Sequence, residues 1–258
     1  MFRNGNSIWS AIPPVTKNLI IINVIIWFAM VLFHGSFADK MLDLGGLHYW
    51  KGCDFHVGQL FTYMFMHDTS NMAHLFFNMF TLFMFGITLE RVLGGARFLF
   101  YYITCGVGAG LIQEFAWMLT AEDLAIKTFA NAYGVGFEEM ADAIKRVDMG
   151  FTVGTVGQNL QMFYNHYLVT IGASGAIYGV LLAFGMLFPN RPLYLMFIPV
   201  PIKAKWMVMG YGLIELALGV SSANDGIAHY AHLGGMLFGV LLILYWKHQG
   251  IIRRNDFY

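Results

Sequence analysis

Apolar residues along this chain of 258 residues gather into six long runs that are separated by more polar segments. Each run approaches the roughly 20 residues that an α-helix needs to cross the hydrocarbon core of a bilayer. The runs cover about 19–33, 72–89, 96–119, 168–188, 205–220 and 228–246. This pattern predicts an all-α, polytopic membrane protein with six transmembrane helices.

Two of the segments between the runs are long. The first, 34–71, is rich in glycine, histidine and aromatic residues, which favours a half-inserted or interfacial structure. In the second, 120–166, Thr120 and Asp123 fit a capping box. Apolar residues then recur at helical spacing, namely Phe137, Met140, Ala141, Ile144 and Val147. We therefore expect one membrane domain over 1–258, with an insertion at about 120–166 of two or three short amphipathic helices lying on the outer surface.

Composition supports the membrane assignment, because 12% of the residues are charged against roughly 25% in soluble domains. Acidic and basic residues balance at 15 each, which leaves no net charge to attract nucleic acid. With a cytoplasmic N-terminus, ten Lys and Arg residues fall in inner segments and five in outer ones, as the positive-inside rule requires. We expect a multi-pass protein of the bacterial inner membrane with both termini in the cytoplasm. The two cysteines, Cys53 and Cys105, have no metal-site spacing.

Ser174 stands among small residues in the fourth run, in the stretch GASGAIYG. The 15 residues from Ser174 to Phe188 would form roughly 22 Å of helix, which is shorter than the hydrocarbon core of about 30 Å. Ser174 should therefore lie several ångströms below the outer surface. The backbone leading into it must be buried in protein or line a water-filled cavity.

His232 in the sixth run lies at about the same expected depth as Ser174. Small residues four apart let helices pack closely, and both runs carry such pairs, Gly175 with Gly179 and Gly235 with Gly239. Close packing would bring the serine oxygen within the roughly 2.6 to 3.2 Å that separates a nucleophile from its base. A lone membrane serine that bonds its own helix is the alternative interpretation.

Further polar side chains are expected around this pair. His74 and Asn78 lie on one helix face, and with the backbone N–H of Ser174 they could stabilise an oxyanion. The alternative for these two residues is a polar clasp between helices. Tyr178, one turn after Ser174, could stack on the imidazole of His232, or it could be an ordinary core or interfacial tyrosine.

These motifs resemble those of the rhomboid intramembrane serine proteases. GASGAIYG resembles the family's G-x-S-G motif with its tyrosine, AHLGGMLFG its A-H-x-x-G-x-x-x-G motif and HLFFNM its H-x-x-x-N motif. The stretch GITLERVLGGARFLFYY resembles the turn between the second and third helices. The resemblance covers nearly the whole chain except 120–166, and it implies a rhomboid-like bundle of six transmembrane helices.

The resemblance also implies roles for the site residues. Ser174 would be the nucleophile and His232 the general base, in a dyad without a third carboxylate. His74, Asn78 and the N–H of Ser174 would form the oxyanion site. Gly172 would leave room beside the scissile carbonyl, and Tyr178 would pack against His232. The substrates would be single-span membrane proteins cut near the outer face, and no cofactor or metal is implied.

Other positions depart from the family pattern or leave a choice open. His67 matches an outer-loop histidine that helps to tether this region, with a spacing to His74 that is two residues longer. Gln59 stands where many members carry arginine. Glu215 could bond within a gate between the second and fifth helices or be a packed structural residue, and His229 is expected to cap the chamber without a catalytic role.

Other functional classes fit the sequence less well. A metalloprotease would need H-E-x-x-H, and no His-Glu pair occurs in the chain. A membrane aspartyl protease would need two membrane aspartates, and the candidates in this chain, such as Asp225, are expected in loops. An inactive rhomboid-like binding or quality-control protein remains an alternative, although such relatives typically lose the serine or the histidine. A transporter or channel would need a continuous polar route across the membrane, whereas the polar groups of these runs are expected on the outer side only. The expected partners are transmembrane substrates and membrane lipid, and the oligomeric state does not follow from the sequence.

Overall fold

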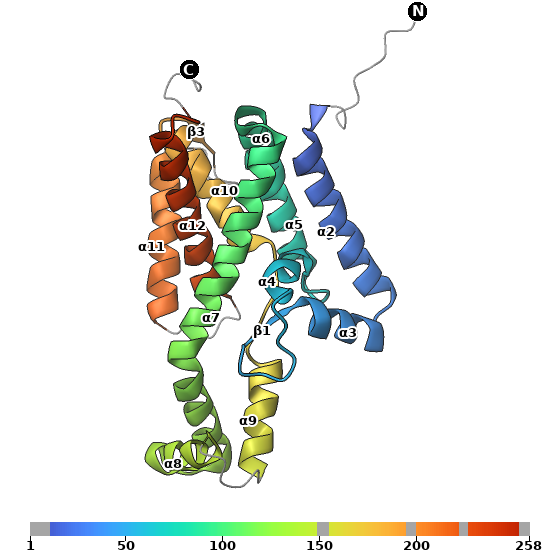
Figure 1. Cartoon of the computed structure of the whole chain (residues 1–258), viewed down its shortest axis with the longest axis vertical. Coiled ribbons are helices and arrows are strands. Elements are labelled where there is room, and N and C mark those ends of the chain that lie inside the picture. Colours follow the sequence, from blue (N-terminus) through green and yellow to red (C-terminus); the bar gives the residue numbers. More distant parts are fainter. Residues whose placement is uncertain (1–10, 149–154, 195–199, 222–226, 253–258) are drawn as a thin grey trace, which may run out of the picture.

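The computed structural model describes residues 11–148, 155–194, 200–221 and 227–252. This part of the chain is almost entirely helical (Figure 1). The helices are α2 (Pro14–Leu32), α3 (Ser36–Gly45), α4 (Gln59–Thr62), the 3-10 turn η1 (Tyr63–Phe65), α5 (Met72–Thr81), the π-helical turn η2 (Leu82–Gly86), α6 (Ile87–Leu93), α7 (Gly95–Tyr133), α8 (Phe137–Asp148), α9 (Thr155–His166), α10 (Ser174–Leu187), α11 (Ala204–Val220) and α12 (His229–His248). Four two-residue strands form two antiparallel pairs, β1 (Leu47–His48) with β2 (Val169–Thr170) and β3 (Pro192–Leu193) with β4 (Ile202–Lys203).

The membrane-spanning bundle is built around α10. The described residues contain four helical stretches long and apolar enough to span a bilayer, Pro14–Leu32, Met72–Leu93, Gly95–Tyr133 and His229–His248. The shorter apolar helix α10 packs against α7, α11 and α12, and ten of its 14 residues are buried. The predicted all-α, polytopic membrane fold is confirmed.

Large apolar side chains cover the outside of the bundle. Ile25 of α2, Phe77 of α5, Leu213 of α11 and Leu241 of α12 are each more than half exposed. An apolar surface spread over so many helices would be unusual on a protein in water. In a bilayer these side chains face lipid.

The fourth apolar run becomes helical later than predicted. Residues 168–173 are not helical, and α10 begins at Ser174. Within this segment β2 pairs with β1, Leu47 opposite Thr170. The N–H of Gly172 donates to the carbonyl oxygen of Tyr63 at 2.9 Å. Gly172 has a φ of 121°, a conformation that glycine adopts readily and other residues avoid, so the helix cannot extend back through it.

The segment 120–166 also differs from expectation at its start. The predicted capping box is wrong, because Thr120 lies inside α7 and its hydroxyl donates to the carbonyl oxygen of Ala116. Helix α7 runs unbroken for 39 residues to Tyr133 and is followed by Gly134 in the left-handed conformation, a common helix stop. The predicted amphipathic helix around Met140 is confirmed as α8.

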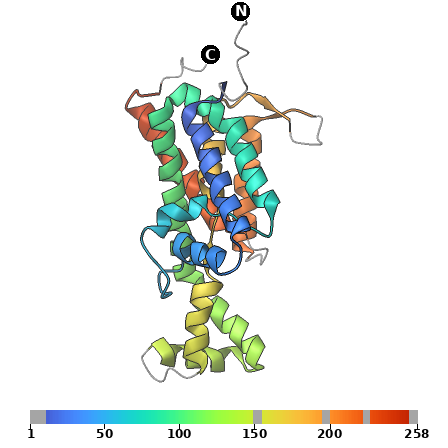
Figure 2. The same ribbon diagram turned by 90° about the vertical axis from the view of Figure 1, so that its right-hand side faces the viewer.

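The helices of this segment project from the bundle and do not lie flat against it. Figures 1 and 2 show α7 continuing past the other helices, with α8 across its far end and α9 returning toward the bundle. We call this side of the molecule the insertion end. The opposite side, near which the first and last described residues lie, is the terminal end (Figure 1).

Gln59 anchors the first long loop, although it stands at the place of an arginine. Its side chain is fully buried. The amide nitrogen donates to the carbonyl oxygens of Asp43 and Asp54, at 2.9 and 2.8 Å. The amide oxygen accepts from the N–H groups of His48 and His56, at 3.3 and 3.2 Å. One side chain thus ties together four points of the loop.

Helices α7 and α9 hold the same loop from the other side. The N–H of Trp50 donates to the carboxylate of Glu114 on α7 at 3.0 Å. The N–H of Cys53 donates to the side-chain oxygen of Asn165 on α9 at 2.8 Å. The loop before α5 and the helices of 120–166 therefore pack as one unit at the insertion end.

A buried glutamate organises the terminal end. Glu90 of α6 is 3% exposed. Its carboxylate accepts from the N–H of Val15 at 2.9 Å and from the N–H and hydroxyl of Thr16 at 2.6 and 2.7 Å. The negative charge therefore caps the N-terminus of α2, where the helix dipole favours an anion.

The role of Gln59 leads to a stability prediction. Gln59→Leu keeps the side-chain volume but leaves buried backbone groups without partners, at a cost of about 1 to 3 kcal/mol for each such group. We expect a clear fall in the thermal unfolding midpoint in detergent. Gln161→Leu is the control, because its amide makes only longer bonds, of 3.3 and 3.4 Å. Equal midpoints for the two variants would show that Gln59 does not anchor the loop.

Candidate functional site

The structure brings Ser174 and His232 together. Ser174 is the first residue of α10, and His232 lies in the first turn of α12. The Nε2 atom of His232 is 2.8 Å from the Oγ atom of Ser174. His232 is 7% exposed, whereas Ser174 is partly buried. The distance is that of a nucleophile hydrogen-bonded to its base.

The two helices meet through glycine. A Cβ atom added to Gly235 would overlap the carbonyl oxygen of Gly175, and one added to Gly179 would lie 3.0 Å from the carbonyl oxygen of Gly235. One added to Gly239 would lie 3.3 Å from the Cα atom of Gly179. The predicted close packing of the two glycine pairs is confirmed.

Tyr178 covers one face of the imidazole. Its ring stacks on the ring of His232 with centroids 4.2 Å apart and planes 8° apart. Its hydroxyl donates a hydrogen bond to the Oε1 atom of Glu215. Tyr178 therefore contacts the imidazole and a carboxylate at once.

A carboxylate, that of Glu215, lies beside His232, a neighbour that the family pattern did not imply. The Oε2 atom of Glu215 is 3.0 Å from Nδ1 of His232, a contact that does not have the geometry of a hydrogen bond and becomes an ion pair when the ring is protonated. The same oxygen is 2.6 Å from Nδ1 of His229. Glu215 therefore binds residues of α12 and, through Tyr178, of α10. Among the described contacts, none joins it to the second membrane helix, where a gate was one of the two interpretations. The sequence signal for these contacts was the presence of a carboxylate, that of Glu215, in an otherwise apolar run.

The three groups Glu215, His229 and His232 also offer donor atoms that lie within 4.8 Å of one another. Oxygen and imidazole nitrogen are common zinc ligands, at about 2.0 to 2.2 Å from the metal. Here the carboxylate instead contacts both imidazoles directly, at 2.6 and 3.0 Å. Tetrahedral ligands at those bond lengths would stand about 3.3 Å apart, so a metal would have to separate groups that now bind each other.

Gly172 keeps a small space open beside the serine. A Cβ atom added there would lie 2.8 Å from Nε2 of His74 and 3.8 Å from Oγ of Ser174. His74 and Ser174 therefore border the same space, which any larger residue at position 172 would fill. Ser174 also starts α10, so its N–H is one of the helix N-terminal donors that lack a partner within the helix.

Asn78, the other expected oxyanion donor, is bonded within its own helix in this structure. It is buried, and its amide nitrogen donates to the carbonyl oxygen of His74 one turn earlier at 2.9 Å. This bond lies within α5, so it is not a clasp between helices either. Among the described contacts, none joins Asn78 to Ser174.

His67 packs beneath His74 from the loop before α5. It is fully buried, and the two ring centroids are 5.1 Å apart. Burial and the neighbouring His74 lower the pKa of His67 to about 3. His67 is therefore neutral at physiological pH and supports His74 by packing.

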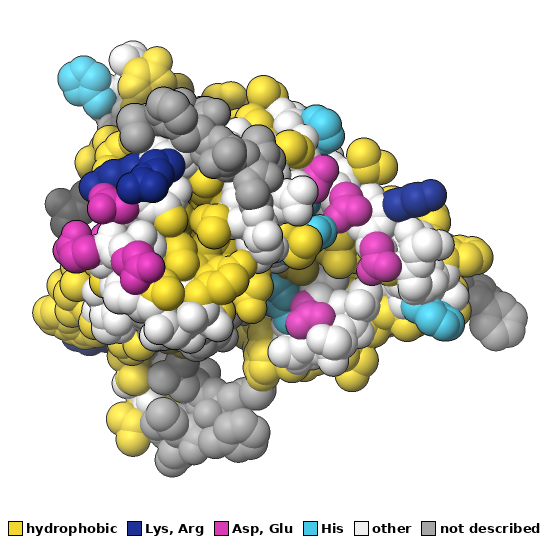
Figure 3. Space-filling model, turned by 90° about the horizontal axis from the view of Figure 1, so that it is seen from below, with side chains coloured by type: hydrophobic (Ala, Val, Ile, Leu, Met, Phe, Trp, Pro, Cys, Tyr) yellow, Lys and Arg dark blue, Asp and Glu magenta, His cyan; other side chains and the backbone are white. Residues whose placement is uncertain are grey.

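Around the site, the insertion end mixes polar and apolar character. Figure 3 shows carboxylate and histidine side chains among hydrophobic ones on this face.

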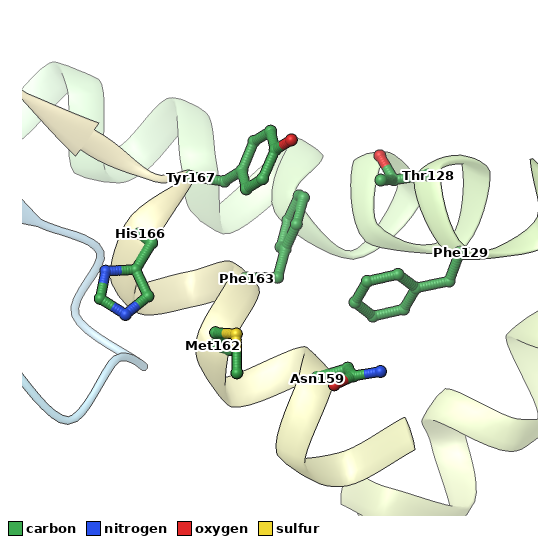
Figure 4. Close-up of a pocket in the computed structure, with 7 residues that line it drawn as sticks. All are labelled: Thr128, Phe129, Asn159, Met162, Phe163, His166 and Tyr167. Atoms are coloured by element: carbon green, nitrogen blue, oxygen red, sulfur yellow. The ribbon is translucent and has the colours of Figure 1, made fainter. Parts of the chain in front are cut away.

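A cavity of about 230 Å³ lies between α7 and α9 (Figure 4). It is lined by Thr128, Phe129, Asn159, Met162, Phe163, His166 and Tyr167. This cavity belongs to the insertion and does not include Ser174 or His232.

Comparison with known proteins identifies the family of the chain. The family model described as Rhomboid domain matches residues 54–126 and 128–249. The chain is 29% identical over 168 residues to Rhomboid protein 1, mitochondrial, of Saccharomyces cerevisiae, covering 65% of this chain and 36% of the yeast protein. It is 26% identical over 242 residues to Rhomboid protease AarA of Providencia stuartii, covering 88% of this chain and 70% of that protein. Because the family match spans most of its length, the chain belongs to the rhomboid family.

Proposed function

We propose that this protein is an intramembrane serine endopeptidase that cleaves single-span membrane proteins near the outer face of the membrane. The observation that carries the proposal is the 2.8 Å contact between Oγ of Ser174 and Nε2 of His232. Membership of the rhomboid family and similarity to a rhomboid protease of Providencia stuartii support an intramembrane protease activity. An inactive binding protein would have no need of this pair.

Catalysis follows the chemistry of a serine nucleophile with a histidine base. Nε2 of His232 takes the hydroxyl proton while Oγ of Ser174 attacks the substrate carbonyl carbon. The tetrahedral intermediate collapses as the imidazolium returns that proton to the leaving amine nitrogen. Water then attacks the acyl-enzyme carbonyl while Nε2 of His232 accepts a proton from it. As the second tetrahedral intermediate collapses, the imidazolium gives that proton to Oγ of Ser174 and the carboxylic acid product is released.

The oxyanion that forms in each step needs hydrogen-bond donors. The N–H of Ser174 at the start of α10 and the side chain of His74 border the space where it would form. Asn78 would join them through the second hydrogen of its amide, because the first is donated to the carbonyl oxygen of His74. Gly172 supplies the room for the carbonyl, and Tyr178 holds the imidazole plane.

The proposal includes a membrane arrangement. The chain would form one membrane domain over 1–258 with an insertion at about 120–166, and both termini would face the cytoplasm of a bacterium. Water would reach Ser174 from the insertion end. The substrate would have to unwind locally, because a helical peptide bond has its carbonyl hydrogen-bonded and covered. The reaction needs no cofactor or metal, since the pair carries its own base.

Single and double substitutions test the proposed pair. Ser174→Ala and His232→Ala should each abolish cleavage of a transmembrane substrate by purified protein in detergent or vesicles. The double variant should be no worse than either single one, because nucleophile and base act as a unit. Ser221→Ala, at an exposed serine after α11, is the control and should retain wild-type turnover.

Substantial activity in either alanine variant would contradict the pair. A folded wild-type protein that cleaves no transmembrane substrate would favour the inactive relative.

Gly172 provides a second test of the site. Gly172→Ala places a methyl group 2.8 Å from Nε2 of His74 and 3.8 Å from Oγ of Ser174. We expect kcat to fall by about 100-fold or more, the scale of a lost oxyanion donor. Gly134→Ala is the matched control, because Gly134 also has a positive φ, of 67°, but open space around it.

The control should lose a little stability and keep its turnover. If Gly172→Ala loses stability to the same extent and also keeps its turnover, the space beside Ser174 is not where the substrate carbonyl binds.

A further inference from the structure

Glu215 is a carboxylate in an otherwise apolar membrane helix. It is 6% exposed, and an ionisable group in such a place is costly unless it is paired. Its Oε1 atom accepts a hydrogen bond from the hydroxyl of Tyr178, and its Oε2 atom accepts one from Nδ1 of His229. Both partners lie on neighbouring helices, α10 and α12, so the carboxylate is fixed in position by contacts outside its own helix.

The fixed carboxylate faces the far side of the imidazole that contacts the serine. Oε2 of Glu215 is 3.0 Å from Nδ1 of His232, while Nε2 of the same ring is 2.8 Å from Oγ of Ser174. Carboxylate, imidazole and hydroxyl thus stand in series across α11, α12 and α10. We propose that Glu215 is a positioning residue that orients His232 and stabilises its imidazolium during cleavage, an inference that rests on the proposed protease function.

The carboxylate of Glu215 affects both the neutral and the protonated imidazole of His232. When Nε2 accepts the serine proton, the ring must carry its other proton on Nδ1, and a carboxylate beside Nδ1 favours that tautomer. Once the ring is an imidazolium, the same negative charge attracts it. The Nδ1 contact lies off the hydrogen-bond direction, and such contacts often tighten only when substrate binds.

Tyr178 contacts both His232 and Glu215. Its ring lies flat on the imidazole of His232 and its hydroxyl binds Glu215, so it holds both at once. The other polar or titratable groups around His232 are Ser174 of α10, His229 of α12 and His74 of α5. Among the described residues, Glu215 is the one carboxylate within 4.0 Å of His232.

The test is the steady-state kinetics of Glu215→Gln, which removes the charge and keeps the shape. We expect kcat to fall about 10- to 100-fold with KM nearly unchanged, well short of the roughly 10⁴-fold loss when the carboxylate of a fully aligned triad is replaced. The acid limb of the pH profile of kcat should move to lower pH, because an imidazolium without its carboxylate gives up its proton more readily.

Glu90→Gln is the matched control, since Glu90 is also a buried glutamate of the bundle but lies at the terminal end. It should lower the unfolding temperature and leave the acid limb in place. An unchanged kcat and acid limb in Glu215→Gln would overturn the positioning role while leaving the protease function intact. A folded wild-type protein that cleaves no transmembrane substrate would instead overturn the protease function itself.

Tyr178→Phe keeps the inference testable if Glu215→Gln does not fold. This variant retains the ring on His232 and removes the hydroxyl that holds Glu215. We expect kcat to fall about 3- to 10-fold, the size of one lost hydrogen bond of about 1 kcal/mol, with KM unchanged. A wild-type kcat would show that the position of Glu215 does not matter to the reaction.

Discussion

The backbone contact between α10 and α12 is the constraint on which the rest of the site depends. At Gly175 and Gly235 the helices approach so closely that no side chain fits between them. Ser174 lies one residue before this contact and His232 one turn before it, so the crossing sets their separation. A bulkier residue at Gly235 would push the helices apart, and the 2.8 Å contact between Ser174 and His232 would be lost.

A second constraint comes from the bilayer, which cannot satisfy the polar groups of an extended backbone. The segment that leads into Ser174 is not helical, and protein supplies its partners: β1 pairs with β2, and the carbonyl of Tyr63 binds the N–H of Gly172. The loop that provides these partners is itself held by Gln59 and by the insertion. The insertion end therefore stabilises the loop that holds the backbone leading into Ser174.

Local sequence features predicted the parts of the structure that depend on local physics. Apolar runs indicated the spanning helices, and small residues four apart indicated the close crossing of α10 and α12. The start of α10 was missed because residues 168–173 continue the apolar run without a break, whereas pairing with β1, the bond of Gly172 to Tyr63 and the positive φ of Gly172 keep them out of the helix. The capping box at Thr120 failed because α7 has no break at that point. Glu215 contacts Tyr178, which lies 37 residues earlier, so a local pattern cannot reveal the pair. The partners of Gln59 are nearer in sequence, but they are backbone groups of an irregular loop, which has no periodic pattern to predict them.

The central claim is that Ser174 is a nucleophile activated by His232. Mass spectrometry of the protein treated with a small fluorophosphonate tests it most directly, because this reagent forms a covalent adduct only with an activated serine. The account predicts one adduct, on Ser174, which is lost in His232→Ala even though the serine remains. No adduct on Ser174 in the folded wild-type protein, or equal labelling in His232→Ala, would contradict it.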